Sequence, residues 1–337
     1  TKSAIHIPLE AGLDEELLRY LEAAGNWDLI PLSTPEDRQA AAQRLVDQGW
    51  QVTIELAIDH IQHFRAGGTD DDDQEWDVLI AREREYDVLA GRHRYPALEN
   101  SPLLTIVDQP LDRYANRLID AGWITHITAV HNLTETRVLN GFTRVTPSAM
   151  PARSGRRLMW GRDTTDDDWL PGYRTHGEGI FLEFDASRLG PQGATHDLTG
   201  RQLFNLSAAG TIMHTFAHAM IVQIAESAGY PVPSIRDRVY DISDGRLGVL
   251  IYTAEGDAGG TLGGLVAHVD RALFDPLVDR TLTALGWCAQ DPVCLETRLD
   301  HERSIGAACH QCVLLPETSC ELFNAFLDRS ALLEYLT

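Results

Sequence analysis

Cysteine is absent from the first 287 residues of this 337-residue sequence, and all five cysteines fall between Cys288 and Cys320. Basic residues are also scarce: lysine and arginine together number 28 against 50 acidic residues, which gives a formal net charge of −22. The electric field of this negative charge repels polyanions. In addition, contacts with phosphates need clustered Lys and Arg side chains. The charge therefore argues against a free-standing DNA-binding module, although basic residues could line a groove that a partner completes.

Long apolar runs are missing too. No stretch approaches 18 consecutive apolar residues, so we expect no transmembrane helix and no membrane partner. Residues 1–9 lack the basic start and apolar core of a signal peptide. Together with a pI near 4.8, these absences predict a cytoplasmic protein.

Motifs of common enzymes are absent as well. The sequence has no Gly-x-Ser-x-Gly elbow, no helicase P-loop and no His-x-Lys phosphodiesterase motif, so it shows no ATPase or hydrolase chemistry of its own. A glycine-rich run at 256–264 could cradle a phosphate before a helix, but Lys-Ser or Lys-Thr does not follow it, and Glu255 and Asp257 would repel an anion. Tight packing between a strand and a helix is the favoured interpretation of this run.

The chain is long enough for two domains, or three, and its apolar content of 44% suits a globular core. We predict an α+β protein in three regions: a mostly helical part at 1–100, a mixed strand and helix part at 101–200, and a C-terminal domain at 201–337 that carries the cysteines.

Hydrophobic periodicity and capping signals predict the individual elements. Helices are expected at 13–24, 34–48, 53–64, 76–89, 111–118, 208–228, 262–273 and 317–336. Runs of β-branched residues predict strands at 103–107, 124–130, 179–184 and 247–253. Loops are expected at 67–74, which holds four consecutive aspartates, and at 151–172.

The cysteine cluster is the strongest signal in the sequence. Cys309 and Cys312 form a C-x-x-C pair, whose sulfurs can both reach one tetrahedral ion, and Cys288 and Cys294 flank an Asp-Pro turn. These four thiolates are the predicted ligands of a closed, structural Zn²⁺ site, with Cys320 as a substitute for Cys288 or Cys294. Buried free thiols and an iron–sulfur cluster are the alternatives, and the imidazole of His310 could compete as a ligand.

Two histidines lie four residues apart in the predicted helix 208–228, so His214 and His218 share one face. This is the spacing of H-E-x-x-H metalloproteases, but Thr215 stands where the glutamate would be. Two buried, hydrogen-bonded or interface-facing histidines are the favoured interpretation. The alternative is a metal-dependent nuclease or hydrolase that uses His214, His218 and Asp257.

Local basic clusters are the candidate DNA contacts. Arg137 and Arg144 flank an aromatic turn, and Arg153, Arg156 and Arg157 lie in the polar loop at 151–172. Pairing of these arginines with the many acidic residues is the alternative.

Several strings, read in order, resemble one family. They are ETRVLNGFTRV (135–145), GEGIFLEF (177–184), HTFAHAMI (214–221), SIRDRVYD (234–241), IYTAEGDAGGTLGGL (251–265) and AACHQCVLLPETSCELFNAFLDR (307–329). They resemble the DrmB family of the DISARM anti-phage system and, more distantly, the zinc-binding domain of MrfA-type DNA-repair helicases. The resemblance covers residues 76–337 and is most specific over the last 130.

The resemblance implies a partnership. Members of this family associate with a helicase-type ATPase, DrmA, and the pair engages DNA to restrict phage, while a separate methyltransferase marks the host. The family's cysteine positions correspond to Cys288, Cys294, Cys309 and Cys312. The implied function is a non-catalytic, zinc-binding accessory subunit that reaches DNA through the complex. Family members are usually longer, and this sequence does not begin with Met, so we expect a region before Thr1 to be absent.

Overall fold

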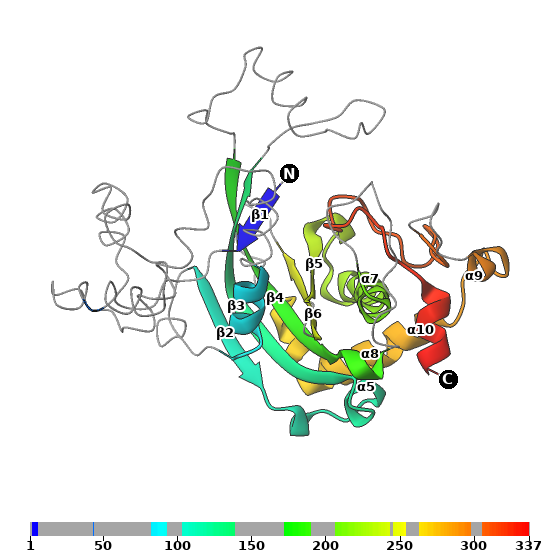
Figure 1. Cartoon of the computed structure of the whole chain (residues 1–337), viewed down its shortest axis with the longest axis horizontal. Coiled ribbons are helices and arrows are strands. Elements are labelled where there is room, and N and C mark those ends of the chain that lie inside the picture. The colour runs from blue at the N-terminus through cyan, green and yellow to red at the C-terminus, as the bar shows by residue number, and fades with distance from the viewer. Residues whose placement is uncertain are drawn as a thin grey trace, which may run out of the picture.

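The computed structural model describes residues 2–5, 43, 82–92, 103–138, 172–189, 206–242, 245–253, 263–297 and 305–336. Within them the protein is α+β, as predicted, and centres on one antiparallel sheet (Figure 1). The helices predicted at 13–24, 34–48 and 53–64, apart from residue 43, and the loops at 67–74 and 151–171 lie outside the described residues. The division into three regions stays a prediction, and strands from all three enter the sheet.

Among the described residues the sheet has six strands, in the order β1-β3-β4-β6-β5, and β2 also pairs with β3. All pairings are antiparallel, and β1 and β2 lie along different parts of the same side of β3. The strands are β1 (Lys2–Ile5), β2 (Leu104–Gln109), β3 (Ile124–Val138), β4 (Gly172–Asp185), β5 (Ile235–Asp241) and β6 (Arg246–Thr253). The strand predictions are confirmed at β2, β3, β4 and β6, although β3 and β4 are longer than expected, and β1 and β5 were not predicted.

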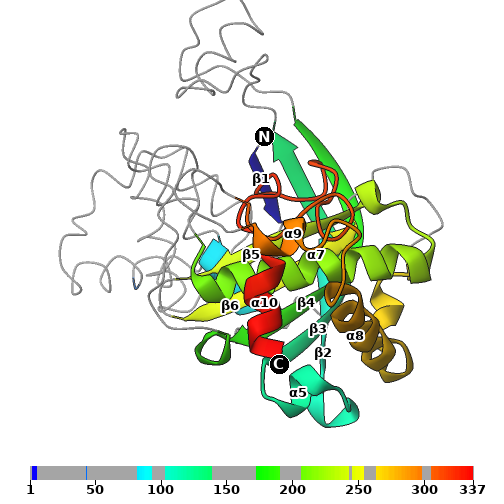
Figure 2. The ribbon, with the colours of Figure 1, turned by 90° about the vertical axis from the view of Figure 1, so that its right-hand side faces the viewer.

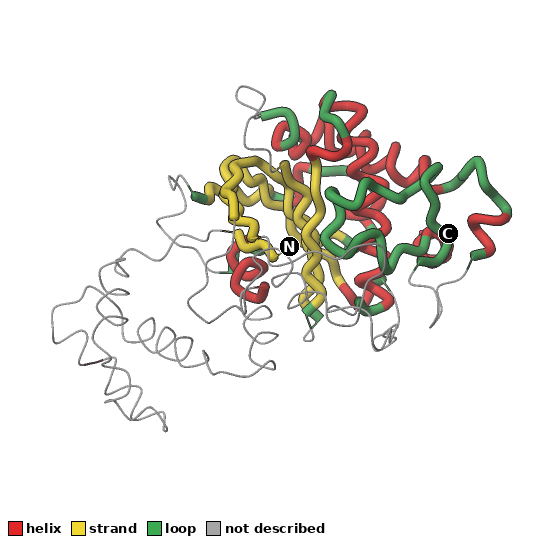
Figure 3. Tube along the Cα trace, turned by 90° about the horizontal axis from the view of Figure 1, so that it is seen from above, coloured by secondary structure: helices red, strands yellow, loops and turns green. Residues whose placement is uncertain are grey.

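Both faces of the sheet are covered, which explains the long apolar runs in its strands. Successive side chains of β4 point to opposite faces of the sheet. Ile180 and Leu182 belong to the larger core beneath the helices, and Phe181 belongs to a smaller core on the opposite face. Seen from above, the strands lie between a larger group of helices on one side and the helix at 82–89 on the other (Figure 3).

The larger core is built around α7 (Ala208–Ala228), whose bounds agree with the prediction. Ser207 caps its first turn by accepting a hydrogen bond from the Gly210 amide, and Gly229 ends it in the left-handed conformation at φ 75°. The helix is long and apolar enough to cross a membrane by composition alone. However, 83% of its most apolar stretch is buried inside the protein, as expected of a core helix.

Two helix predictions near the C-terminus were wrong. The segment predicted at 262–273 forms a short 3-10 turn, η6 (Val266–Val269), and then α8 (Arg271–Leu285), because Asp270 caps a new helix there. The segment predicted at 317–336 is helical only in α10 (Arg329–Leu336). Phe323, Asn324 and Phe326 take φ values of 53°, 63° and 58°, which an α-helix cannot contain.

The remaining helical pieces are short. The predicted helix 111–118 appears as η3 (Leu111–Arg113) and α5 (Arg117–Asp120). The others are η4 (Ala186–Arg188), η5 (Val232–Ser234) and α9 (Val293–Glu296). Figure 2 shows α9 and α10 in front of α7, where the C-terminal segment folds over the large core.

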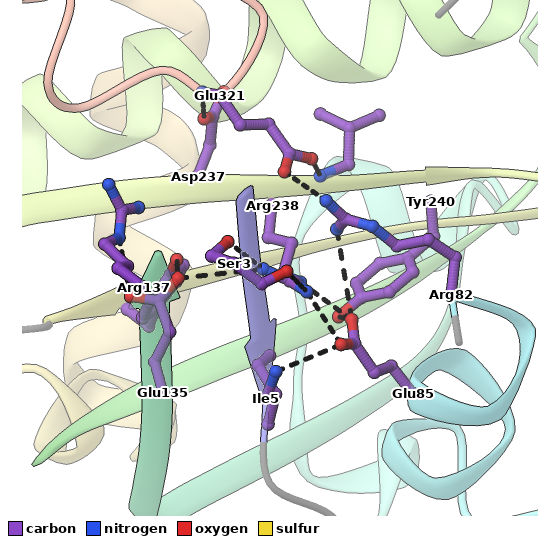
Figure 4. Close-up of polar contacts among 12 residues, drawn as sticks. Ser3, Ile5, Arg82, Glu85, Glu135, Arg137, Asp237, Arg238, Tyr240 and Glu321 are labelled. Atoms are coloured by element: carbon purple, nitrogen blue, oxygen red, sulfur yellow. Dashed lines mark hydrogen bonds and ion pairs between the residues drawn. The ribbon is translucent and has the colours of Figure 1, made fainter. Parts of the chain in front are cut away.

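The opposite face of the sheet carries a helix at 82–89, within the predicted span 76–89, and β1 lies near it. A buried ion pair ties these pieces to β5 (Figure 4). Arg238 donates two hydrogen bonds of 2.7 Å to the Glu85 carboxylate and one of 2.8 Å to the Ser3 hydroxyl. The Ile5 amide and the Tyr240 hydroxyl donate to the same carboxylate. Segments as far as 235 positions apart in the sequence thus meet at one buried charge pair.

Candidate metal centre

Four cysteine sulfurs lie close together near the C-terminal end of the protein. Cys288 follows α8 and Cys294 lies in α9, while Cys309 and Cys312 lie in a tight turn at 309–313. The four sulfur atoms all lie within 4.8 Å of one another. The Asp-Pro turn between the first two cysteines contains a cis peptide bond at Asp291-Pro292.

The sulfur spacing fits one tetrahedral ion. The Cys288–Cys309, Cys309–Cys312 and Cys294–Cys312 sulfurs are 3.4, 3.7 and 3.8 Å apart, and all five cysteines are free thiols. Bonds of about 2.3 Å from zinc to sulfur place tetrahedral sulfurs about 3.8 Å from one another. A disulfide would need about 2.05 Å, so the spacing suits a shared metal ion and excludes paired disulfides in this state.

Backbone amides support thiolates at this centre. The amides of Gln290 and Gln311 each approach the sulfur two residues earlier, Cys288 and Cys309, at 3.4 Å. Burial opposes ionisation of Cys309, but the Gln311 amide and the neighbouring thiols lower its pKa overall. Burial raises the pKa of Cys294 to about 11, so this thiol keeps its proton at neutral pH until a metal ion displaces it.

A buried guanidinium lies beside the cluster. Arg329, fully buried at the start of α10, donates to the Leu285 carbonyl at 3.0 Å and to the Asp291 carboxylate. Burial lowers the pKa of Arg329, but hydrogen bonds and charge from Asp291, and then the contact with Cys294, raise it overall. Asp291 already balances the charge of Arg329, so this buried pair lies beside the four thiols without adding net charge.

The structure places the other cysteine elsewhere. Cys320 is buried and lies 3.3 Å from His214 Nε2, in a second group with His218 and Asp237. His310, considered as a competing ligand, is exposed and belongs to neither group. Both helix histidines are fully buried, and each Nδ1 is hydrogen-bonded to a backbone carbonyl, in line with the favoured interpretation of the sequence. Asp257, the third residue of the alternative enzyme, lies outside the described residues.

The end of the glycine-rich run binds an internal carboxylate. The Gly263 and Leu265 amides both donate to Glu178, a buried residue of β4, and the Tyr230 hydroxyl donates to it at 3.2 Å. A Cβ at Gly264 would lie 3.0 Å from the Tyr230 oxygen, so close packing accounts for that glycine. The described part of the run, Gly263 and Gly264, therefore packs closely against β4 and the residue Tyr230 that follows α7.

The candidate DNA contacts are only partly visible. Arg137 lies near the end of β3 with 17% of its side chain exposed, and its Nε donates to the buried Glu135 carboxylate at 3.0 Å. Pairing with an acid thus accounts for Arg137. Arg144, Arg153, Arg156 and Arg157 lie outside the described residues, and their role stays a prediction.

Comparison with known proteins shows that this centre lies in a region similar to a zinc-binding domain. Residues 216–313, which contain all four clustered cysteines, match the MrfA Zn-binding domain. In an alignment of 233 positions that covers 63% of the chain, it is 31% identical to DISARM protein DrmB of Bacillus paralicheniformis. The resemblance drawn from the sequence strings is therefore confirmed. The matched part spans 41% of the DrmB relative.

Proposed function

We propose that this chain is a zinc-binding subunit of a DISARM-type anti-phage defence complex, located in the cytoplasm, where it assists a helicase-type ATPase on DNA. The observation that carries the proposal is the similarity to DrmB together with the four-thiol centre inside the matched zinc-binding domain. Zinc is the ion that four cysteines in tetrahedral spacing favour, and four protein ligands leave no open position for a substrate.

A non-catalytic role is supported by the burial of the best catalytic candidates. His214, His218 and Asp237 are each at most 1% exposed, and their polar atoms face one another and backbone groups. General acid or base catalysis requires contact with the substrate. We therefore favour the accessory role over the alternative nuclease or hydrolase.

The test is reconstitution with the helicase-type ATPase from the same gene neighbourhood. The chain alone should hydrolyse no ATP and should cleave no DNA with Mg²⁺ or Mn²⁺. It should co-purify with the ATPase and raise its DNA-stimulated turnover. Turnover by the chain alone that His214→Gln abolishes would replace the accessory role with the enzyme.

DNA binding by the complex should run through the polar loop. Changing Arg153, Arg156 and Arg157 to Ala should weaken DNA binding and flatten the log–log salt dependence by about 0.9 for each phosphate that the loop no longer neutralises. The matched control changes Arg113, Arg271 and Arg280, which removes the same charge from the described surface. An equal effect of both triple variants would mean that net charge, and not the loop, sets the affinity.

A further inference from the structure

A second group of ligand-type side chains lies buried between α7, β5 and the C-terminal segment. It consists of His214, His218, Asp237 and Cys320, whose ligand atoms lie within 4.8 Å of one another. His214 Nε2 and His218 Nε2 lie 2.8 and 3.0 Å from the same Asp237 oxygen, Oδ2, and the Cys320 sulfur lies 3.3 Å from His214 Nε2. All four residues are buried, with only 0 to 2% of their surface exposed.

The hydrogen bonds fix where the ring protons are. His214 Nδ1 lies 3.2 Å from the Phe326 carbonyl oxygen, and His218 Nδ1 lies 2.9 Å from the Val313 carbonyl oxygen. A carbonyl only accepts, so each Nδ1 carries a proton. A neutral imidazole has one N–H, which leaves both Nε2 lone pairs directed at the Asp237 carboxylate. Such an arrangement is repulsive unless a cation lies among these atoms.

A third buried histidine, His268, shows how both ring nitrogens of a neutral imidazole ordinarily find hydrogen-bond partners. His268 Nδ1 lies 2.8 Å from the Gly264 carbonyl, and its Nε2 lies 2.7 Å from the Ser227 hydroxyl, which can donate to it. His268 therefore needs no cation. Asp237 has no proton to offer in its ionised form, so the paired histidines cannot be satisfied in this way.

Two extra protons would be one source of positive charge, but they suit the site poorly. Two imidazolium rings would lie with their centroids 4.4 Å apart, in full burial, against one carboxylate. One divalent ion balances a carboxylate and a thiolate and accepts both Nε2 lone pairs.

We propose that His214, His218, Asp237 and Cys320 bind a second divalent metal ion of the zinc type, separate from the four-cysteine centre. Two nitrogens, one oxygen and one sulfur are a closed tetrahedral ligand set for zinc. Ligating histidines ordinarily donate their other N–H to a carbonyl or carboxylate, as both rings do here. The ligand atoms need to spread by only a few tenths of an ångström to reach about 3.4 Å, the nitrogen–oxygen spacing around tetrahedral zinc.

Neighbouring backbone amides hydrogen-bond to two of the proposed ligands. The Glu321 amide donates to the other Asp237 oxygen at 3.0 Å (Figure 4), and the Asn324 amide approaches the Cys320 sulfur at 3.3 Å. An ion here would pin the irregular segment at 319–326 to α7 and β5. This accounts for the left-handed residues Phe323, Asn324 and Phe326, since the turn brings the sulfur and a carbonyl to the same helix.

The experiment counts metal ions in the purified full chain by native mass spectrometry and elemental analysis. Wild type should carry two ions, and each of Cys309→Ser, Cys320→Ser and His218→Gln should carry one. The double variant Cys309→Ser/His218→Gln should carry none. The control His268→Gln, which alters a buried histidine with an ordinary hydrogen-bond pattern, should keep two.

Cobalt substitution provides a readout that does not depend on the variants at the second group. In Cys309→Ser protein whose only cobalt is at the second site, the thiolate-to-cobalt band should have about one quarter of the strength expected for four thiolates, because one sulfur binds. A metal count in wild type that His218→Gln and Cys320→Ser leave unchanged would overturn the proposal. So would ¹⁵N NMR of wild type that shows His214 and His218 both doubly protonated.

Discussion

The buried pair of Glu85 and Arg238 gives the sharpest test of the fold. Arg238→Met keeps most of the side-chain volume but leaves the Glu85 carboxylate, 3% exposed, without its bidentate partner. Removing one member of a buried ion pair costs about 3–5 kcal/mol, because the remaining charge stays desolvated. We expect urea unfolding, followed by tryptophan fluorescence at neutral pH, to show a loss of that size.

The pH dependence identifies the cause. In wild type, burial raises the pKa of Glu85, but the charges of Arg238 and Arg82 reverse this and lower it overall. A lowered folded pKa stabilises the protein above the unfolded pKa, and this stability is lost as pH falls through the folded pKa. In Arg238→Met the burial effect is no longer reversed by Arg238. The carboxyl should then take up a proton readily, and the loss relative to wild type should shrink between about pH 7 and pH 5.

The control is the same substitution at an exposed ion pair. Arg271, whose side chain is 63% exposed, lies 3.4 Å from Asp275 on α8, so Arg271→Met should cost less than about 1 kcal/mol. Equal losses in the two variants, or a loss in Arg238→Met that does not change with pH, would refute the reasoning.

Two further substitutions test local features, each by urea unfolding against wild type. Gly177→Ala should cost at least about 3 kcal/mol or prevent folding, because the new Cβ would lie 1.6 Å from the Thr253 carbonyl oxygen; a variant of wild-type stability would mean that the two strands do not approach this closely. Asp270→Ala should cost about 1 kcal/mol, because Asp270 accepts the Ala272 amide at 2.8 Å at the start of α8; no loss would show that this cap does not stabilise the helix.

Local signals carried the sequence predictions that are confirmed. α7 was predicted with correct bounds, because its apolar run is continuous and Gly229 ends it. The grouping of Cys288, Cys294, Cys309 and Cys312 followed from their spacing, although spacing alone left Cys320 as a substitute.

Long-range partners could not be predicted in this way. β5 escaped notice because its charged residues resemble an exposed segment, whereas Asp237 faces the α7 histidines and Arg238 meets Glu85 across 153 positions of sequence. Arg329 was missed for the same reason, since its partner Asp291 lies 38 positions earlier. The predicted terminal helix failed because apolar spacing does not reveal left-handed residues such as Phe323.

The central claim is that Cys288, Cys294, Cys309 and Cys312 hold one zinc ion. X-ray absorption at the zinc edge should be measured on the full chain carrying His218→Gln. In this variant the signal comes from the four-cysteine centre and not from the second group. The account predicts one zinc per chain with four sulfur ligands at about 2.3 Å. Folded protein without zinc, or zinc surrounded mainly by nitrogen and oxygen, would contradict it.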